Sequence, residues 1–213
     1  MRRFTIGLVA VVATVWLSGC AAPRDYTALR EHMPRSVLVL PPLNESLDVK
    51  ATYGVLSTVT EPLAEMGYYV YPVAVIDLFL KENGLPTAGE MHQIPLNKID
   101  EIIGADAVLY MAIEEYGTKY TVLDSSTIVR LKARLVDVKT GDLLWDGYVD
   151  VRVSSSSGSN SLIGMLVSAT VNQVVASSTD EAHGVSAQAN TQLFTTRNKG
   201  LLFGPRHPGF LAD

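Results

Sequence analysis

The sequence of 213 residues has a formal net charge of −5, which becomes −7 if Arg2 and Arg3 are removed with a leader. This length suits one domain of ordinary size. The acidic balance argues against nucleic acid as a partner, because nucleic-acid-binding domains carry basic patches. Cys20 is the only cysteine, so an intramolecular disulfide is excluded.

The first 20 residues have the parts of a bacterial lipoprotein leader. Arg2 and Arg3 precede an apolar run at 6–17, and residues 17–20 are Leu-Ser-Gly-Cys, which matches the lipobox. The run is shorter than the about 20 apolar residues that cross a bilayer, which favours a cleaved signal over a retained transmembrane helix. We therefore predict a signal peptide at 1–19.

Cys20 is then expected to be the first residue of the mature protein and to carry acyl chains such as palmitate, which anchor it without a spanning segment. A buried structural thiol and a catalytic thiol are the competing roles, and a leader boundary supplies neither the pocket nor the base that they need. Ala21 stands where an aspartate commonly retains lipoproteins at the inner membrane. The expected location is therefore the outer membrane, facing the periplasm, with residues 20–34 as a lipidated tether.

Residues 35–180 are predicted to form one α/β (α+β) domain, a mixed β-sheet with helices packed on it. Continuous apolar runs predict buried strands at 36–40 and 107–113, and a β-favouring run predicts a further strand at 68–71. Helical spacing between them predicts helices at 49–66, 73–81 and 96–103, and the first of these completes a β-α-β unit.

Local details of these helices are also predicted. Pro62 should kink or divide the first helix, because proline lacks the N–H that an inner turn requires. The second helix is expected to place four apolar residues on one side and to stop at Asn83-Gly84, and the third to stop at Gly104. Those four residues are Val75, Ile76, Phe79 and Leu80. Thr87 and Glu90 have the spacing of a capping box.

The clearest pattern is a hairpin over 128–153, in which odd-numbered positions are apolar and even-numbered positions are mostly charged. The segment Lys139-Thr140-Gly141 is expected to form a three-residue turn with Gly141 in the left-handed conformation of a G1 bulge. This register places opposite charges across the hairpin, Arg134 facing Asp146 and Arg130 facing Asp150. We interpret the basic stripe as a solvated, charge-paired sheet face that helps to fix the register.

After a serine-rich loop, residues 162–176 are predicted to form a helix that is apolar around most of its circumference. Such a helix is buried on more than one side, either against its own sheet or in a dimer interface, and it is too short to favour membrane insertion. The interface residues of that second alternative are Leu162, Met165, Leu166 and Val167. Residues 181–213 are expected to be a partly ordered C-terminal tail that packs over the domain or over a partner, and the sequence predicts no particular helix or strand there.

No catalytic or metal-binding motif is present in the sequence. The four histidines, His32, His92, His183 and His207, are far apart along the chain. Glu114 and Glu115 are adjacent, and because neighbours on a strand point to opposite faces we expect one rim charge and one partly covered side chain. Asp106 is interpreted as a turn residue. Catalytic, metal and cofactor-binding residues are therefore predicted to be absent.

Several segments together resemble a family of outer-membrane lipoproteins that includes a genome-derived neisserial antigen. They are the lipobox at Cys20, Val-Leu-Val-Leu-Pro-Pro-Leu-Asn at 37–44, Gly-Ala-Asp-Ala-Val-Leu at 104–109 and Asp-Val-Lys-Thr-Gly-Asp-Leu-Leu-Trp at 137–145. The folded part is similar to the N-terminal domain of TolB and to the α/β core of the curli-secretion lipoprotein CsgG. The resemblance implies a non-enzymatic accessory of a transport or secretion assembly, often dimeric.

Two hypotheses of different classes follow. The first is a periplasm-facing interaction module that presents its apolar helix or an edge strand to an envelope protein or to a second copy of itself. The alternative is a binder or carrier of a small envelope ligand, a lipid or a glycan, which requires a pocket lined by apolar residues and a few polar groups. A hydrolase is a remote third, which two convergent titratable side chains in a deep cleft would revive.

Overall fold

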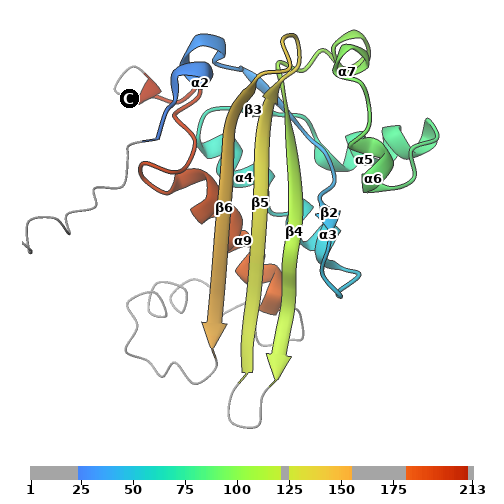
Figure 1. Cartoon of the computed structure of the whole chain (residues 1–213), viewed down its shortest axis with the longest axis vertical. Coiled ribbons are helices and arrows are strands. Elements are labelled where there is room, and N and C mark those ends of the chain that lie inside the picture. Colours follow the sequence, from blue (N-terminus) through green and yellow to red (C-terminus); the bar gives the residue numbers. More distant parts are fainter. Residues whose placement is uncertain (1–23, 121–124, 155–180, 211–213) are drawn as a thin grey trace, which may run out of the picture.

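The computed structural model describes residues 24–120, 125–154 and 181–210. One mixed sheet runs through the molecule in the order β3-β1-β4-β5-β6, and the short strand β2 pairs with β4 in line with β1 (Figure 1). β1 is parallel to β3 and β4, whereas β4, β5 and β6 are antiparallel to one another. The strands are β1 Ser36–Val39, β2 Leu43–Asn44, β3 Tyr69–Val70, β4 Ala107–Tyr120, β5 Ser125–Asp137 and β6 Leu143–Ser154.

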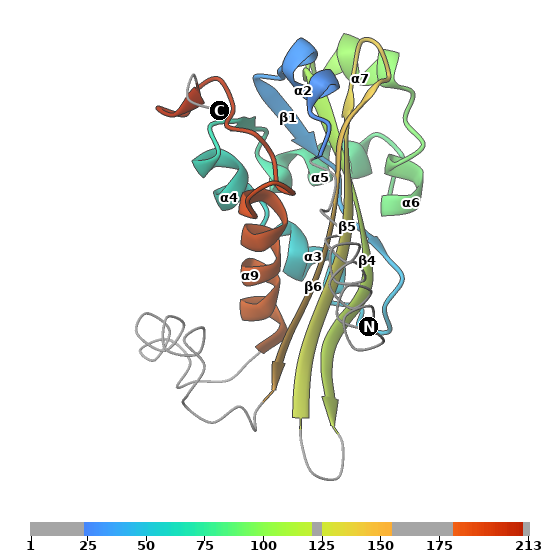
Figure 2. The same ribbon diagram turned by 60° about the vertical axis from the view of Figure 1, so that its left-hand side comes forward.

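Helices cover both faces of this sheet, which Figure 2 shows nearly edge-on. On one face α3, α4 and α9 pack over odd-numbered strand residues such as Val37 and Leu109. On the other face α5, α6 and α7 pack over even-numbered residues such as Leu38 and Val108. The helices are α2 Thr27–His32, α3 Ala51–Leu56, α4 Thr60–Glu65, α5 Val73–Glu82, α6 Ala88–Met91, α7 Leu96–Ile102 and α9 Glu181–Thr195. The expected mixed sheet with packed helices is confirmed.

The helix predicted at 49–66 is divided, as Pro62 led us to expect. α3 ends at Leu56 and α4 begins at Thr60, so that Pro62 lies in the first turn of α4, where a missing N–H costs no helical hydrogen bond. The capping box of Thr87 and Glu90 at the start of α6 is confirmed. Gly84 and Gly104, which follow α5 and α7, adopt positive φ angles of 87° and 74° as helix stops.

The predicted apolar side of α5 is only half correct. Ile76 and Leu80 are buried, whereas Val75 is 62% exposed and Phe79 is 38% exposed. One helix face in contact with the sheet can bury a narrow stripe of side chains. Val75 and Phe79 lie outside that stripe, and they leave apolar surface on the outside of the molecule.

The hairpin has the predicted register but not the predicted turn. Arg134 faces Asp146 and Arg130 faces Asp150. The turn is closed by the Asp137 N–H donating to the Asp142 carbonyl, which makes the loop one residue longer than expected. A bulge then shifts the pairing between Leu135 and Val136 and restores the register. Gly141 has a φ of 80°, as the turn prediction required.

Both expected ends of the domain need correction. Residues 24–34 do not form a free tether, since α2 packs on β6 and Leu29 is fully buried in the main core. Residues 181–213 contain the regular element α9, which buries Val185, Ala189 and Phe194 against the sheet. The apolar helix predicted at 162–176, with Leu162, Met165, Leu166 and Val167, lies outside the described residues, as do 1–23.

Candidate functional site

The antiparallel half of the sheet leaves its even-numbered face open, since α5, α6 and α7 cover β1 and the start of β4. Charged side chains from β4, β5 and β6 form a ladder on this open face. The guanidinium of Arg130 contacts Asp150 at 2.9 Å and Glu115 at 3.0 Å, and Lys132 pairs with Glu114. The pKa of Glu115 is held below its ordinary value, mainly by the hydrogen bond from Lys119 and to a smaller extent by the charge of Arg130.

Glu114 and Glu115 correct a prediction, because both lie on this open face. A register shift between Ile113 and Glu115 inserts one residue into β4, so the alternation of faces is interrupted there. Ile113 before the bulge and Tyr116 after it are both buried in the main core. Each carboxylate has a cationic partner from β5, which makes the pair part of a solvated charge ladder and not a general acid and base.

A shallow groove of about 340 Å³ lies where this open face meets α6. His92 Nε2 donates a hydrogen bond to the Pro41 carbonyl at 2.9 Å, and the His92 ring meets Tyr110 edge-on at 5.3 Å. Burial lowers the pKa of His92 and raises that of Tyr110. Arg134 lies over the Tyr110 ring at 6.0 Å, and Lys132 and Tyr148 also line the groove, which therefore has two cations and three aromatic rings in its walls.

β6 forms one edge of the sheet, and no strand among the described residues pairs with its outer side. The Asp146 carbonyl accepts a hydrogen bond from Arg24, so it points outward and away from β5. In an antiparallel strand, outward and inward residues alternate. Tyr148, Asp150 and Arg152 therefore also direct their backbone N–H and C=O groups outward. By contrast β3, at the other edge, is only two residues long.

A second, apolar groove of about 570 Å³ lies among α5, α6 and α7. Ile94, Ile99 and Ile103 contribute to its walls, and Phe79 and Ile102 expose apolar surface at its rim. A few polar groups, among them Asn83, Gln93 and Lys98, also line it. This composition and volume match those of small-molecule sites, which are mainly apolar with few polar groups.

The structure places the remaining candidate residues apart from one another. His183 Nε2 lies 3.1 Å from Ser57 Oγ, but both residues are exposed and no carboxylate of the described chain contacts this histidine. His32 lies 3.5 Å from Asp137 and 3.6 Å from Asp142, and His207 stacks on Phe203. The described residues contain no cluster of metal-ligating side chains.

Asp106 lies at a bend just before β4, and its carboxylate makes long-range contacts to the start of β1 that the prediction of a turn residue did not include. Its carboxylate accepts hydrogen bonds from the backbone N–H groups of Arg35 and Ser36 and from the Ser36 hydroxyl, at 2.9–3.0 Å. Ser36 Oγ in turn contacts the N–H of Asp106 at 3.0 Å. These contacts join the start of β1 to the start of β4.

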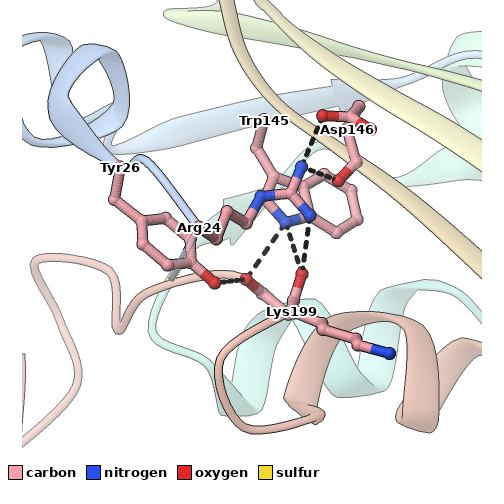
Figure 3. Close-up of polar contacts among 6 residues, drawn as sticks. Arg24, Tyr26, Trp145, Asp146 and Lys199 are labelled. Atoms are coloured by element: carbon pink, nitrogen blue, oxygen red, sulfur yellow. Dashed lines mark hydrogen bonds and ion pairs between the residues drawn. The ribbon is translucent and has the colours of Figure 1, made fainter. Parts of the chain in front are cut away.

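Sequence reasoning missed one cluster, which Figure 3 shows at the start of the described chain. The Arg24 guanidinium lies 5.5 Å from the Trp145 ring and donates to the Lys199 carbonyl at 3.1 Å and to Asp146. Trp145 Nε1 donates to the carbonyls of Lys199 and Gly200, each at 3.0 Å. Nothing in the sequence brings 24, 145 and 199 together, so no signal could have identified this cluster.

Two comparisons establish the family. The family model described as "Putative lipoprotein GNA1162-like" matches residues 24–206. The chain belongs to this family. A Neisseria meningitidis serogroup B protein described as "Putative lipoprotein NMB1124/NMB1162" is 46% identical over 211 residues, which cover 97% of each chain. The crystal structure of lipoprotein GNA1162 from Neisseria meningitidis is 49% identical and covers 68% of this chain and 100% of that one, with a TM-score of 0.57.

Membership of the GNA1162-like family confirms the resemblance to lipoproteins that include a neisserial antigen. The likeness to TolB and CsgG stays a prediction. In the described part of this GNA1162-like chain, no helix has the length and apolar character to cross a membrane. Cys20, the predicted lipidation site, lies outside that part.

Proposed function

We propose that this protein is a non-enzymatic interaction module of an envelope transport or secretion assembly, held in the outer membrane by acyl chains on Cys20 and facing the periplasm. The lipid anchor is supported by membership of a lipoprotein family. It is also supported by the Neisseria meningitidis relative, which is described as a lipoprotein and matches 97% of the chain. No nucleic acid takes part.

The edge strand β6 carries the proposal. Its 12 residues far exceed the two of β3, and natural proteins shorten or cover edges that are not meant to pair. The outward backbone groups of Tyr148, Asp150 and Arg152 form a template to which an extended segment of another protein, or β6 of a second copy, can add a strand. Charges on the adjoining open face would then select the partner.

Crosslinking in intact cells tests this proposal. A photoreactive phenylalanine analogue replaces Tyr148, which is 56% exposed, and in a matched control it replaces Val75, which is 62% exposed on the far helix α5. We expect a specific adduct from position 148 and none from 75. An adduct with a second envelope protein supports the accessory role, and an adduct with the chain itself supports a homodimer.

Two further variants distinguish strand addition from side-chain contact. Arg152→Pro removes an outward N–H without removing a bond to β5, whereas Arg152→Ala removes only the side chain. We expect the proline variant to lose the adduct at 148 and the alanine variant to keep it, with folding of each checked by circular dichroism. Equal adducts from both variants, or none from position 148 in the unmodified background, would contradict the proposal.

The groove among α5, α6 and α7 supports a second candidate function, a binder or carrier of an apolar envelope ligand such as a lipid. The probe is a fluorescent long-chain fatty acid, titrated into the purified protein. Ile94→Lys places a charge in the groove and should weaken binding about tenfold or more, because a charge is costly to bury beside an acyl chain. Val75→Lys, outside the groove, is the matched control. Equal affinities in both variants would exclude this site.

A further inference from the structure

The chain is fixed to the domain very soon after the predicted lipid anchor. Arg24 follows Cys20 by four residues, and only 22% of its side chain is exposed. Its guanidinium lies between the rings of Tyr26, at 5.9 Å, and Trp145, at 5.5 Å, while its N–H groups donate to Asp146 and Lys199 (Figure 3). The cation–π contacts and the hydrogen bonds to two residues together define both the position and the direction of the side chain.

The next residues extend this attachment. The Tyr26 hydroxyl donates to the Gly200 carbonyl at 2.8 Å, and Leu29 of α2 is fully buried in the main core. The acceptor turn is itself tightly built, because a Cβ on Gly200 would lie 2.1 Å from the Phe194 carbonyl oxygen. We call residues 24–29, together with the residues that they contact, Trp145, Asp146, Lys199 and Gly200, the anchor clamp.

The anchor clamp limits where a lipid on Cys20 can reach. Four residues span at most about 14 Å when fully extended. β6 runs from Asp146 for eight further residues to Ser154, a distance of about 27 Å. An acyl chain attached at Cys20 therefore enters the bilayer near the start of β6 and cannot do so beside its far end.

We propose that the anchor clamp holds the domain against the bilayer by the end that carries α2 and the β5–β6 turn. The far ends of β4, β5 and β6, which extend past the described helices in Figure 1, then point away from the membrane. The partner of this surface is a phospholipid bilayer. The inference rests on the proposed lipid at Cys20, and it adds an orientation: the outward edge of β6 is presented at a fixed height above the bilayer.

Depth-dependent quenching on the full mature lipoprotein tests this orientation. The protein is reconstituted into vesicles of phosphatidylethanolamine and phosphatidylglycerol that contain a headgroup nitroxide lipid. A fluorescent label is placed on Lys139→Cys in the β5–β6 turn or on Val153→Cys at the far end of β6, both of which are exposed. We expect quenching at 139 to exceed that at 153 several-fold. Equal quenching at both positions would overturn the proposal.

A spacer variant removes the short connection. A Gly/Ser segment of about 20 residues inserted between Ala22 and Pro23 adds a mean reach of about 25 Å. The quenching at 139 should then fall to the level at 153, while the same segment appended after Asp213 should change neither label. Retention of the full difference despite the spacer at 22 would show that another feature orients the domain.

Trp145 reports on the clamp itself, because it is the only tryptophan beyond residue 20. Arg24→Ala should expose its ring, shift its emission to longer wavelength and increase its quenching by acrylamide. Arg30→Ala, an exposed arginine of α2 outside the cluster, is the control and should leave the emission unchanged. An unchanged emission in Arg24→Ala would contradict the docking of residue 24.

The two proposals fail in different ways. Mass spectrometry that shows no acyl mass on Cys20 would overturn the lipid anchor and with it the orientation, while the Trp145 response would still establish whether the segment docks. An acylated protein that floats with vesicles but shows equal quenching at 139 and 153 would overturn the orientation alone.

Discussion

The two halves of the sheet are built for different environments. Around β1 the sheet is parallel and covered on both faces, so Val37, Leu38 and Val39 are all buried. In β6 the sheet is antiparallel and covered on one face, so buried Val149 and Val151 alternate with exposed charged residues. The covered half therefore acts as the scaffold and carries the groove of the second candidate function, whereas the open half supplies the edge, the charge ladder and the clamp site.

The largest expected effect comes from comparing two residues on the same face of the sheet. Leu38 is fully buried under α5–α7, and Leu38→Ala should cost about 2–5 kcal/mol of unfolding free energy through lost contacts and a cavity. Lys132→Ala, on the open half, should cost less than about 1 kcal/mol. Urea unfolding of both variants measures the difference. Similar losses would mean that the open half is covered in the native protein.

Valine substitutions at two neighbouring positions of β6 compare the covered and the open face of the same strand. A Cβ at Gly147 would lie 2.3 Å from the Trp145 ring and 2.8 Å from Leu193, so Gly147→Val should destabilise the protein by about 1–3 kcal/mol. Tyr148→Val points to the open face and should change stability by no more than about 0.5 kcal/mol. Thermal unfolding of the two variants gives both values, and equal values would be inconsistent with the observed alternation.

The same contrast explains which elements could be predicted from the sequence. β1 and the start of β4 are continuous apolar runs, and apolar and polar residues alternate strictly in the hairpin. The spacing of apolar residues alone therefore predicts that these segments are strands and which of their side chains are buried. The bulge at Glu114 has no such signal. One inserted residue reverses the facing of everything after it, and only the cross-strand register reveals it.

The sequence does not predict α9, because polar residues on its buried face bind backbone groups of a distant helix. Asn190 donates to the Val55 carbonyl at 3.0 Å and to Thr58 Oγ1 at 2.9 Å, and Ser186 donates to the Gly54 carbonyl at 3.2 Å. These acceptors lie where α3 ends, so two fully buried polar residues interrupt the apolar stripe of α9. A helix with polar residues on its buried face resembles a polar tail when only its sequence is considered.

A smaller effect is expected from the charge ladder. The Arg130–Asp150 pair is partly exposed, with 24% and 30% of the two side chains accessible to solvent. A double-mutant cycle with Arg130→Ala and Asp150→Ala should therefore give a coupling of about 0.2–1 kcal/mol, and added salt should reduce it. Because Glu115 also contacts Arg130, the cycle is repeated in Glu115→Gln. A coupling well above this range would indicate that the face is shielded from water.

The smallest expected effect is a pH dependence at the boundary between the two halves. Burial, and to a lesser extent Arg134, lowers the pKa of half-buried His92, although its hydrogen bond to Pro41 opposes this. The unfolded chain, with an ordinary histidine pKa near 6.5, therefore binds a proton first as the pH falls. The stability that neutral His92 contributes is complete above about pH 6.5 and declines below it, until the folded-state pKa is reached.

Urea unfolding between about pH 7.5 and 5 should show the stability of the wild type falling relative to that of His92→Gln. A constant difference over this range would mean that water reaches His92 as freely in the folded protein as in the unfolded chain, and that α6 does not close the groove.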